Sequence, residues 1–249
     1  MKPSKKVLSN RIPRRSLPEL VIDQLGQRIV RGDFNTNGGL PTEPQLSAEL
    51  GISRNVLREA IKVLASKGLV EVRPKTGTRV RTPDQWNMLD PDIVGWFSLD
   101  ASDLQGAHDF VEFRRIIEPQ ASYLAALRAT GEDIARIRAA FERLNACIGQ
   151  PEKVPAADIT FHRSIYDASH NMVLRHLGSL IAPLMRNQVV ITTGPPGSFE
   201  KGLPLHRKVT EAIARRDPKK AEAYSRRLVN MPYADLNEWL HPADRGLLG

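Results

Sequence analysis

Asp158 and His162 have the side-chain types and the spacing to share a metal ion. They are four residues apart in a segment with helical periodicity, so both side chains lie on one face of the expected helix. A carboxylate and an imidazole placed in this way can bind one divalent cation. His206, which begins a later helical segment, is a candidate for the third ligand. On spacing alone, however, an ordinary i, i+4 pair on a helix surface is the simpler interpretation of Asp158 and His162.

A second group of residues has the chemistry of DNA recognition. Arginine can donate two hydrogen bonds to O6 and N7 of guanine, and asparagine can pair with adenine. One arc of a helical segment, beside an apolar stripe, is formed by Arg54, Asn55, Arg58 and Lys62. The following hairpin could add phosphate contacts through Arg73, Lys75, Arg79 and Arg81. A solvated basic face would explain any one of these cations, but not their combination with a turn glycine and a hairpin.

The basic charge of the chain is concentrated in its first third. The chain carries 36 Lys and Arg residues against 28 Asp and Glu, a formal net charge of +8. Residues 1–82 contain 16 of these cations and 7 of the acids, and the tail of residues 1–16 has six cations and no acid. This distribution predicts a polyanion-binding module joined to a larger neutral domain, although a basic surface kept for solubility would give the same counts.

The composition excludes several classes of protein. The 249 residues are 41% hydrophobic, enough for one large or two modest domains with buried cores. No run of eighteen apolar residues is present, so no membrane span is expected, and the basic N-terminus lacks the apolar segment of a secretory signal. Cys147 is the only cysteine, which excludes an internal disulfide and suits a cytoplasmic protein.

The elements that must position these residues are mainly helices. Residues 17–82 are expected to form three helices and a β-hairpin, because helical periodicity with capping residues gives way to alternation over residues 69–73 and 78–81. Residues 83–103, with two prolines and two tryptophans, are expected to form a packed linker. Helical periodicity then continues in segments at about 104–129, 131–148, 155–169, 171–192, 203–216 and 218–240.

Residues 40–80 resemble the winged helix-turn-helix of the GntR family of bacterial transcription regulators. The resemblance lies in Leu40-Pro41-Thr42-Glu43, in Leu-Gly-Ile-Ser-Arg-Asn-Val-Leu-Arg-Glu-Ala over residues 50–60, and in Gly77-Thr78 before Val80. Together with the basic arc, it implies that double-stranded operator DNA is contacted by Thr42, Arg54, Asn55, Arg58, Lys62, Lys75, Thr76 and Gly77. Pro44 departs from the pattern, because family members usually carry an arginine there that contacts DNA. That contact is expected to be lost.

The helical region that follows resembles the FCD effector domain of the FadR subfamily of this family. Its Asp-x-x-x-His signature is matched by Asp158 to His162, and its next histidine by His206. A further histidine of the pattern is replaced by Leu228. The resemblance therefore implies a divalent metal such as Zn²⁺ on three protein ligands, with an open position for water or effector, or else a site without metal.

Two arginines of the helical region are candidates for binding the effector. By the same resemblance, Arg114 faces the cavity of the FCD domain, where a guanidinium can pair with a ligand carboxylate through two hydrogen bonds. Its alternative role is a surface ion pair with Glu118, four residues later. Arg186, with Asn187 and Gln188, interrupts an otherwise apolar helix and could supply further donors, or could serve the surface or helix packing.

These observations predict a mainly α protein in four parts. They are a basic tail (1–16), a winged helix-turn-helix domain of three helices and a β-hairpin (17–82), a linker (83–103) and an all-α helical-bundle domain (104–240) that binds the effector and dimerises. We expect a cytoplasmic homodimer, without membrane partner or enzymatic activity, that represses a carbohydrate-acid catabolic operon. A small carboxylate such as a sugar acid would release it from its operator. The sugar-acid class follows only from the linker around Trp86 and Trp96, which is similar to that of sugar-acid regulators of the family.

Two alternatives are left open by the sequence. The same DNA-binding protein could respond to an acyl-CoA or an amino acid, and the acyl-CoA type of this fold lacks the metal ligands. Alternatively, a metal-dependent hydrolase could use Asp158, His162 and His206 around an activated water. Against the hydrolase, the sequence contains no His-Glu-x-x-His pattern and no carboxylate placed as a general base, and the basic module would have no role.

Overall fold

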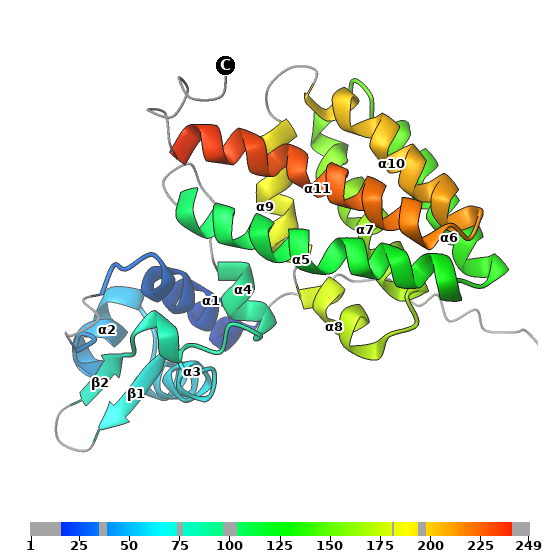
Figure 1. The fold of residues 1–249 in the computed structure, drawn as a ribbon. Helices are drawn as coiled ribbons and strands as arrows, with labels where there is room; N and C mark the ends of the chain where they lie inside the picture. The colour runs from blue at the N-terminus through cyan, green and yellow to red at the C-terminus, as the bar shows by residue number, and fades with distance from the viewer. Residues whose placement is uncertain are drawn as a thin grey trace, which may run out of the picture. The chain divides into compact units, whose positions relative to one another are not determined.

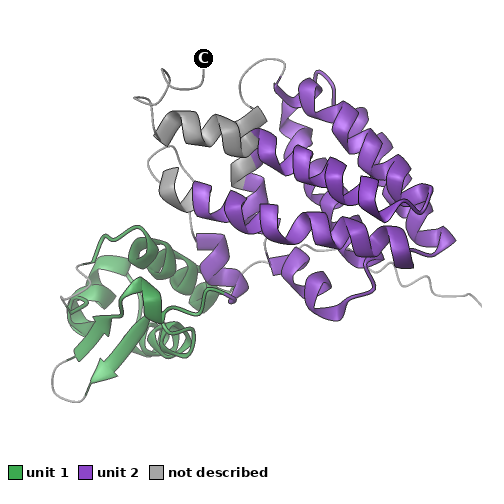
Figure 2. Ribbon diagram, in the orientation of Figure 1, with its two compact units in different colours: residues 1–88 green, residues 89–249 purple. Residues whose placement is uncertain are grey.

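The computed structural model describes residues 16–34, 39–73, 77–96, 104–180, 182–193 and 198–240. The chain divides into two compact units, residues 1–88 and residues 89–249 (Figure 2). The expected mainly α architecture is confirmed, with one small antiparallel sheet among the described residues (Figure 1). None of the helices in these ranges has an apolar stretch long enough to cross a membrane.

The first unit is a three-helix module followed by a hairpin. Its elements are α1 (Leu17–Val30), α2 (Glu43–Leu50), α3 (Arg54–Ser66), β1 (Val70–Arg73), β2 (Gly77–Val80) and the single-turn 3-10 helix η1 (Pro83–Gln85). β1 and β2 pair in an antiparallel register that places Val70 opposite Val80. Leu40 extends the edge of this hairpin, because its N–H donates to the Thr78 carbonyl at 2.8 Å.

Local sequence explains where these helices begin and end. α1 begins with a capping box, in which Ser16 and Glu19 each accept a hydrogen bond from the other's backbone N–H. Gly51 ends α2 with a φ of 65°, a left-handed conformation that glycine adopts without strain. Ser53 then caps α3 by accepting from the Val56 N–H at 3.4 Å. The turn between α2 and α3 is therefore short, as in a helix-turn-helix.

The second unit is a helical bundle. Its elements are α4 (Pro91–Trp96), α5 (Leu104–Arg128), α6 (Gly131–Asn145), η2 (Pro151–Lys153), α7 (Val154–Ala168), α8 (Met172–Leu180), α9 (Ala182–Thr193), α10 (Ser198–Ala214) and α11 (Pro218–Leu240). α5 and α11 lie side by side (Figure 1), and Arg115 Nε on α5 donates to Asn230 Oδ1 on α11 at 2.7 Å. α7 packs against α5, α6, α8 and α9, so it occupies the centre of the bundle.

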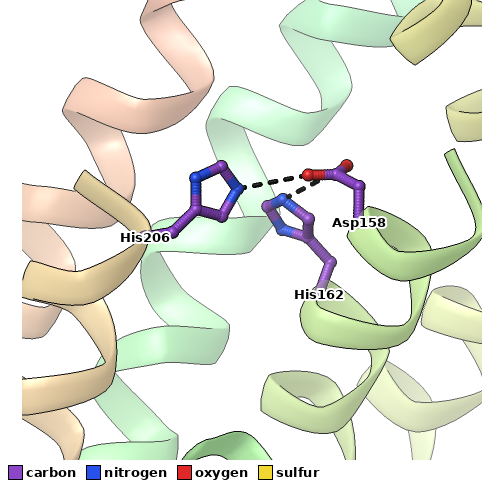
Figure 3. Close-up of side chains that lie close together, drawn as sticks. All are labelled: Asp158, His162 and His206. Carbon is purple, nitrogen blue, oxygen red and sulfur yellow. Dashed lines mark hydrogen bonds and ion pairs between the residues drawn. The ribbon is translucent and has the colours of Figure 1, made fainter. Parts of the chain in front are cut away.

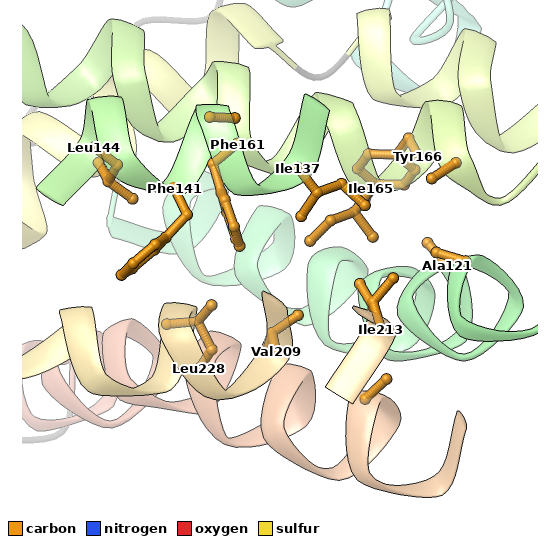
Figure 4. Close-up of a cluster of buried hydrophobic side chains, with 14 of the residues drawn as sticks. Ala121, Ile137, Phe141, Leu144, Phe161, Ile165, Tyr166, Val209, Ile213 and Leu228 are labelled. Atoms are coloured by element: carbon orange, nitrogen blue, oxygen red, sulfur yellow. The ribbon is translucent and has the colours of Figure 1, made fainter. Parts of the chain in front are cut away.

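The apolar core of the second unit forms around α7 (Figure 4). Phe161 and Tyr166 of α7 are among the largest fully buried side chains of the described chain. They belong to one cluster with Ile137 and Phe141 of α6, Val209 and Ile213 of α10, and Leu228 of α11. Burying a side chain of this size stabilises the fold by about 1.5–3 kcal/mol. This core holds α7 and α10 next to each other, which matters for the residues that project from both helices.

One helix boundary differs from the sequence prediction. The expected helix over residues 171–192 is described as α8 and α9, and residue 181 between them lies outside the described residues. α10 begins at Ser198, not near residue 203, so Pro204 lies inside it and His206 lies in its middle. Inside α10, Pro204 has no N–H to donate to the carbonyl one turn earlier.

In the described part of the expected linker the two tryptophans are buried, whereas most of the other side chains are exposed. Trp86 and Trp96 are 7% and 4% exposed. The Trp86 indole donates to the Arg81 carbonyl at 2.9 Å, which fixes the chain directly after β2. Residues 97–103 of the linker lie outside the described residues.

Candidate metal centre and DNA-binding surface

α3 has one buried and one exposed face, as its periodicity predicts. The buried face consists of Leu57, Ala60, Ile61 and Leu64. The exposed face contains the four residues predicted to contact DNA, Arg54, Asn55, Arg58 and Lys62. The first two of these open the helix directly after its cap. The N-terminal turn of an exposed helix is where recognition helices present side chains to base edges.

Glu43 of α2 holds the side chain of Arg58 across the helix-turn-helix. Arg58 Nε donates to Glu43 Oε2 at 2.8 Å, and the side chains are 59% and 36% exposed. An exposed pair of this kind adds little stability, but it restricts the direction of the guanidinium. Thr42, directly before α2, donates from its N–H and its hydroxyl to Gln45 Oε1, at 2.9 and 2.7 Å. Thr42 and Arg58 are thus both held at the same end of α2.

The hairpin contains three further residues predicted to contact DNA, and one of them, Gly77, belongs to the described residues. Gly77 opens β2 with a φ of 85°, a left-handed conformation that favours glycine. Arg73 and Arg79 are exposed on the two strands, and Arg73 pairs with Glu71 at 2.9 Å. Lys75 and Thr76 lie outside the described residues.

Asp158 and His162 of α7 meet His206 of α10 in the interior of the second unit (Figure 3). All three side chains are buried, so the alternative of a surface pair is wrong. Asp158 Oδ1 lies 3.2 Å from His206 Nε2, and Oδ2 lies 3.7 Å from His162 Nε2. One ligand atom from each residue lies within 4.8 Å of the others. The three atoms could therefore converge on one cation, for which ligand distances are about 2.0–2.2 Å.

Each histidine ring is held through its other nitrogen. His162 Nδ1 lies 2.9 Å from Glu118 Oε2, and His206 Nδ1 lies 2.9 Å from the Gly202 carbonyl oxygen. A carboxylate and a carbonyl only accept hydrogen bonds, so we assign a proton to Nδ1 in both rings. Both Nε2 atoms then lie towards the Asp158 carboxylate, where a cation could be held between the three side chains. The donor set therefore fits a divalent metal such as Zn²⁺.

The surroundings of the cluster keep its carboxylates ionised. Burial alone would raise the pKa of Asp158, but attraction to His162 and a hydrogen bond with His206 outweigh this effect and lower the pKa to about 2. Burial also opposes ionisation of Glu118, yet Arg114 and His162 lower the pKa of Glu118 to about 2. Two ionised carboxylates are thus held in the interior at neutral pH beside the guanidinium of Arg114.

Arg114 is buried beside this cluster and does not lie on the surface. It is 4% exposed, its Nε donates to Glu118 Oε1 at 2.6 Å, and a terminal nitrogen lies 3.4 Å from His162 Nε2. The ion pair with Glu118 that the spacing suggested is therefore formed, but in the protein interior. Sequence reasoning missed Glu118 as a site residue. Its position four residues after Arg114 indicated an ion pair. The sequence did not show that this pair is buried next to the cluster.

Two other positions of interest contribute no ligand to the cluster. Arg186 of α9 has an exposed side chain, and its role in effector binding stays a prediction. The side chains of Asn187 and Gln188 lie outside the described part of the chain. Leu228 of α11 is 8% exposed and lies in the apolar core (Figure 4), so it supplies no ligand atom.

Two family models match the chain, one in each unit. The model of bacterial regulatory proteins of the gntR family matches residues 17–80, and the FCD domain model matches residues 109–231. The chain is 32% identical to the galactonate operon transcriptional repressor of Escherichia coli strain K12, over 81% of this chain and 89% of that protein. It is 37% identical to the putative L-lactate dehydrogenase operon regulatory protein of the same strain, over 66% of this chain and 62% of that protein.

Solved structures share this fold at low sequence identity. A structure of Lar, described as controlling the agr system of Listeria monocytogenes, is 17% identical with a TM-score of 0.64, over 91% of this chain and 99% of that one. Escherichia coli McbR/YncC is 18% identical with a TM-score of 0.51, over 91% of this chain and 100% of that one. At these identities the likeness shows the fold alone.

Proposed function

The chain belongs to the GntR family of bacterial regulatory proteins, and from this premise we propose that it represses a carbohydrate-acid catabolic operon until a small carboxylate effector releases it. Membership of the family makes the chain a DNA-binding transcription regulator and not an enzyme, which sets the hydrolase alternative aside. We further propose that it acts in the cytoplasm as a homodimer on a pseudo-palindromic operator, because two-fold proteins read two-fold sites.

The names of two relatives support a hydroxylated acid as effector. One relative is named for the galactonate operon and another for the L-lactate dehydrogenase operon, which point to galactonate and L-lactate as compounds to test. Both compounds are 2-hydroxy carboxylates, which offer a carboxylate oxygen and a hydroxyl oxygen at chelating distance. An acyl-CoA or an amino acid is the alternative effector, and neither carries this pair of oxygens.

The buried cluster of Asp158, His162 and His206 is the observation that carries this proposal. These residues would hold the metal, which when bound supplies coordination positions for the oxygens of the acid. Leu228 stands where the family pattern has a fourth ligand, so one position is left for the acid or for water. Arg114 lies beside the cluster, where a guanidinium can pair with the effector carboxylate through two hydrogen bonds, in exchange for part of its present contacts with Glu118 and His162.

Glu118 would link effector binding to the packing of the helices. An effector carboxylate that pairs with Arg114 competes with Glu118 for the guanidinium. Glu118 of α5 also contacts His162 of α7, so it connects the two helices. Effector binding is therefore expected to change how α5 packs on α7. α5 follows the segment that leads from the DNA-binding unit, so a change in its packing can alter the placement of the two winged domains of a dimer.

The test is release from operator DNA that the purified protein has selected from a random pool. D-galactonate should release the wild-type protein, and EDTA should suppress the release. Arg114→Lys keeps a positive charge beside Glu118 but loses the planar fork, so it should need at least about tenfold more galactonate at unchanged DNA affinity. Arg115→Lys, its neighbour bound to Asn230, is the matched control and should behave as wild type.

Three outcomes would contradict parts of this proposal. If Arg114→Lys responds as wild type, Arg114 does not bind the effector. If release is unaffected by EDTA, the metal has no part in it. If an acyl-CoA or an amino acid releases the operator and hydroxy acids do not, the sugar-acid class is wrong.

A further inference from the structure

Tyr166 carries a buried hydroxyl whose hydrogen-bonding capacity is unused among the described residues. The side chain is 1% exposed, and its Oη has no hydrogen-bond partner within the described part of the chain. Leaving a buried polar group unpaired costs about 1–3 kcal/mol. Native proteins contain few such groups. A buried group without a partner is therefore a candidate for binding a ligand or for another function.

Tyr166 lies on the same side of α7 as the metal-binding candidates. It follows His162 by four residues and Asp158 by eight, which places the three residues within an arc of about 80° around the helix. Glu118 and Arg114 are among the groups whose charges shift the pKa of this hydroxyl. Its ring belongs to the apolar core, next to Ile165 (Figure 4).

The ring of Tyr166 is held in place by the backbone of α8. A Cβ atom on Gly178 would lie 2.7 Å from Tyr166 Cγ, so the ring packs directly on this glycine. A side chain held in this way presents its hydroxyl without an ordering cost when a ligand binds. Burial and the charge of Glu118 raise the pKa of Tyr166 well above 10, so the phenol keeps its proton at neutral pH.

We propose that the Tyr166 hydroxyl donates a hydrogen bond to an oxygen of the bound acid and thereby favours hydroxylated acids over plain ones. This inference rests on the proposed function, in which the cluster beside Tyr166 binds a small carboxylate. A sugar acid carries several hydroxyl oxygens besides its carboxylate and can satisfy a fixed donor. An acid with an apolar chain would leave the donor unpaired, which is the physical basis of discrimination.

The test is Tyr166→Phe, which removes the hydroxyl and keeps the ring that Gly178 contacts. D-galactonate is titrated calorimetrically into the full-length chain loaded with zinc. We expect the Kd of the variant to rise about tenfold, with zinc content and operator affinity unchanged. Without galactonate, the variant should be as stable as wild type or more stable, because a buried unpaired hydroxyl has been removed. Tyr224→Phe, a half-buried tyrosine of α11 beside Lys208, is the matched control and should bind as wild type.

The outcomes separate this inference from the proposed function. Equal galactonate affinity of Tyr166→Phe and wild type overturns the inference and leaves the proposed function standing. A loss of stability in the variant without galactonate also overturns it, because the hydroxyl is then satisfied inside the protein. A wild-type protein that binds neither galactonate nor L-lactate contradicts the proposed function, and the inference fails with it.

Discussion

Glu118 of α5 supports His162 of α7 through the ring nitrogen that faces away from Asp158, with 2.9 Å between Glu118 Oε2 and His162 Nδ1. The other oxygen of the same carboxylate accepts from Arg114 Nε at 2.6 Å. One buried carboxylate therefore orients both a candidate metal ligand and the arginine proposed to bind the effector. Partners of this kind fix the tautomer of a ligating histidine and raise its basicity.

Replacing Glu118 should weaken metal binding without removing a ligand. Glu118→Gln is expected to lower zinc affinity about 10- to 100-fold, measured by competition with a chromophoric chelator. Asp158→Asn should lower it further, because a ligand is lost. Glu112→Gln, an exposed glutamate of the same helix, is the control. If the wild-type protein takes up no zinc, the coordination half of the proposal is wrong and only the Arg114 contact survives.

Arg58 should read one base step of the operator. Arg58→Ala is expected to cost about 1–3 kcal/mol of binding free energy on specific DNA and to relax the preference at that step. The measurement is binding to the selected operator and to its single-base variants. An unchanged order of preference among the variants would remove Arg58 from the set of reading residues.

The basic tail should act through charge alone. Residues 1–16 carry six cations and no acid, so deleting them should weaken binding to all DNA sequences similarly. If all six neutralise phosphates, the slope of log K against log salt should become shallower by about 5. Titrations at several salt concentrations measure this slope. A deletion that changes sequence preference, with the slope intact, would contradict a purely electrostatic tail.

The full-length protein should be a dimer in solution. Two winged domains related by a two-fold axis would read half-sites about one helical turn apart, or about 34–36 Å. Sedimentation at micromolar concentration without DNA should therefore give the mass of two chains. A monomer under these conditions would mean that dimerisation depends on DNA.

Asp133 should stabilise the start of α6 in a manner that depends on pH. The Thr130 N–H and hydroxyl both donate to Asp133 Oδ2 at 2.7 Å, and His170 Nε2 lies 2.7 Å from the same oxygen. Burial opposes ionisation, but these hydrogen bonds and Arg136 outweigh it and hold the pKa of Asp133 well below its ordinary value. The stabilisation is therefore complete above the unfolded pKa of about 3.9 and is lost as pH falls towards the folded pKa.

Asp133→Ala should lower the free energy of unfolding of the second unit by about 1–3 kcal/mol at pH 7. The difference from wild type should shrink progressively below about pH 4, because Asp133 then takes up a proton in the unfolded wild-type chain while it stays ionised in the folded one. Calorimetric unfolding of the wild-type chain and the variant at pH 7 and at pH 3 measures this difference. Glu132→Ala removes a neighbouring side chain that is 81% exposed and should change stability by at most about 0.5 kcal/mol. A difference that persists unchanged at pH 3 would contradict the assigned charge effect.

The helices, the hairpin and the two faces of α3 could be predicted from the sequence because their signals are local. Gly51 and Ser53 set the turn before α3 through backbone conformation and capping within a few residues. The shared face of Asp158 and His162 follows from the period of a helix. The early start of α10 was missed, because periodicity alone does not show whether a helix begins before or after a proline.

The composition of the buried cluster was decided by tertiary packing. Asp158 and His206 are 48 residues apart, as are Arg114 and His162, and no local rule places such residues in contact. The pairs Glu132–Arg136 and Arg114–Glu118 have the same spacing of four residues, yet the side chains of the first are 81% and 54% exposed and those of the second are 4% and 3% exposed. The spacing determines that the two charges of each pair meet. The packing of other helices, α7 among them, against α5 excludes water from Arg114 and Glu118, and this exclusion turns a common helix pair into part of a candidate binding site.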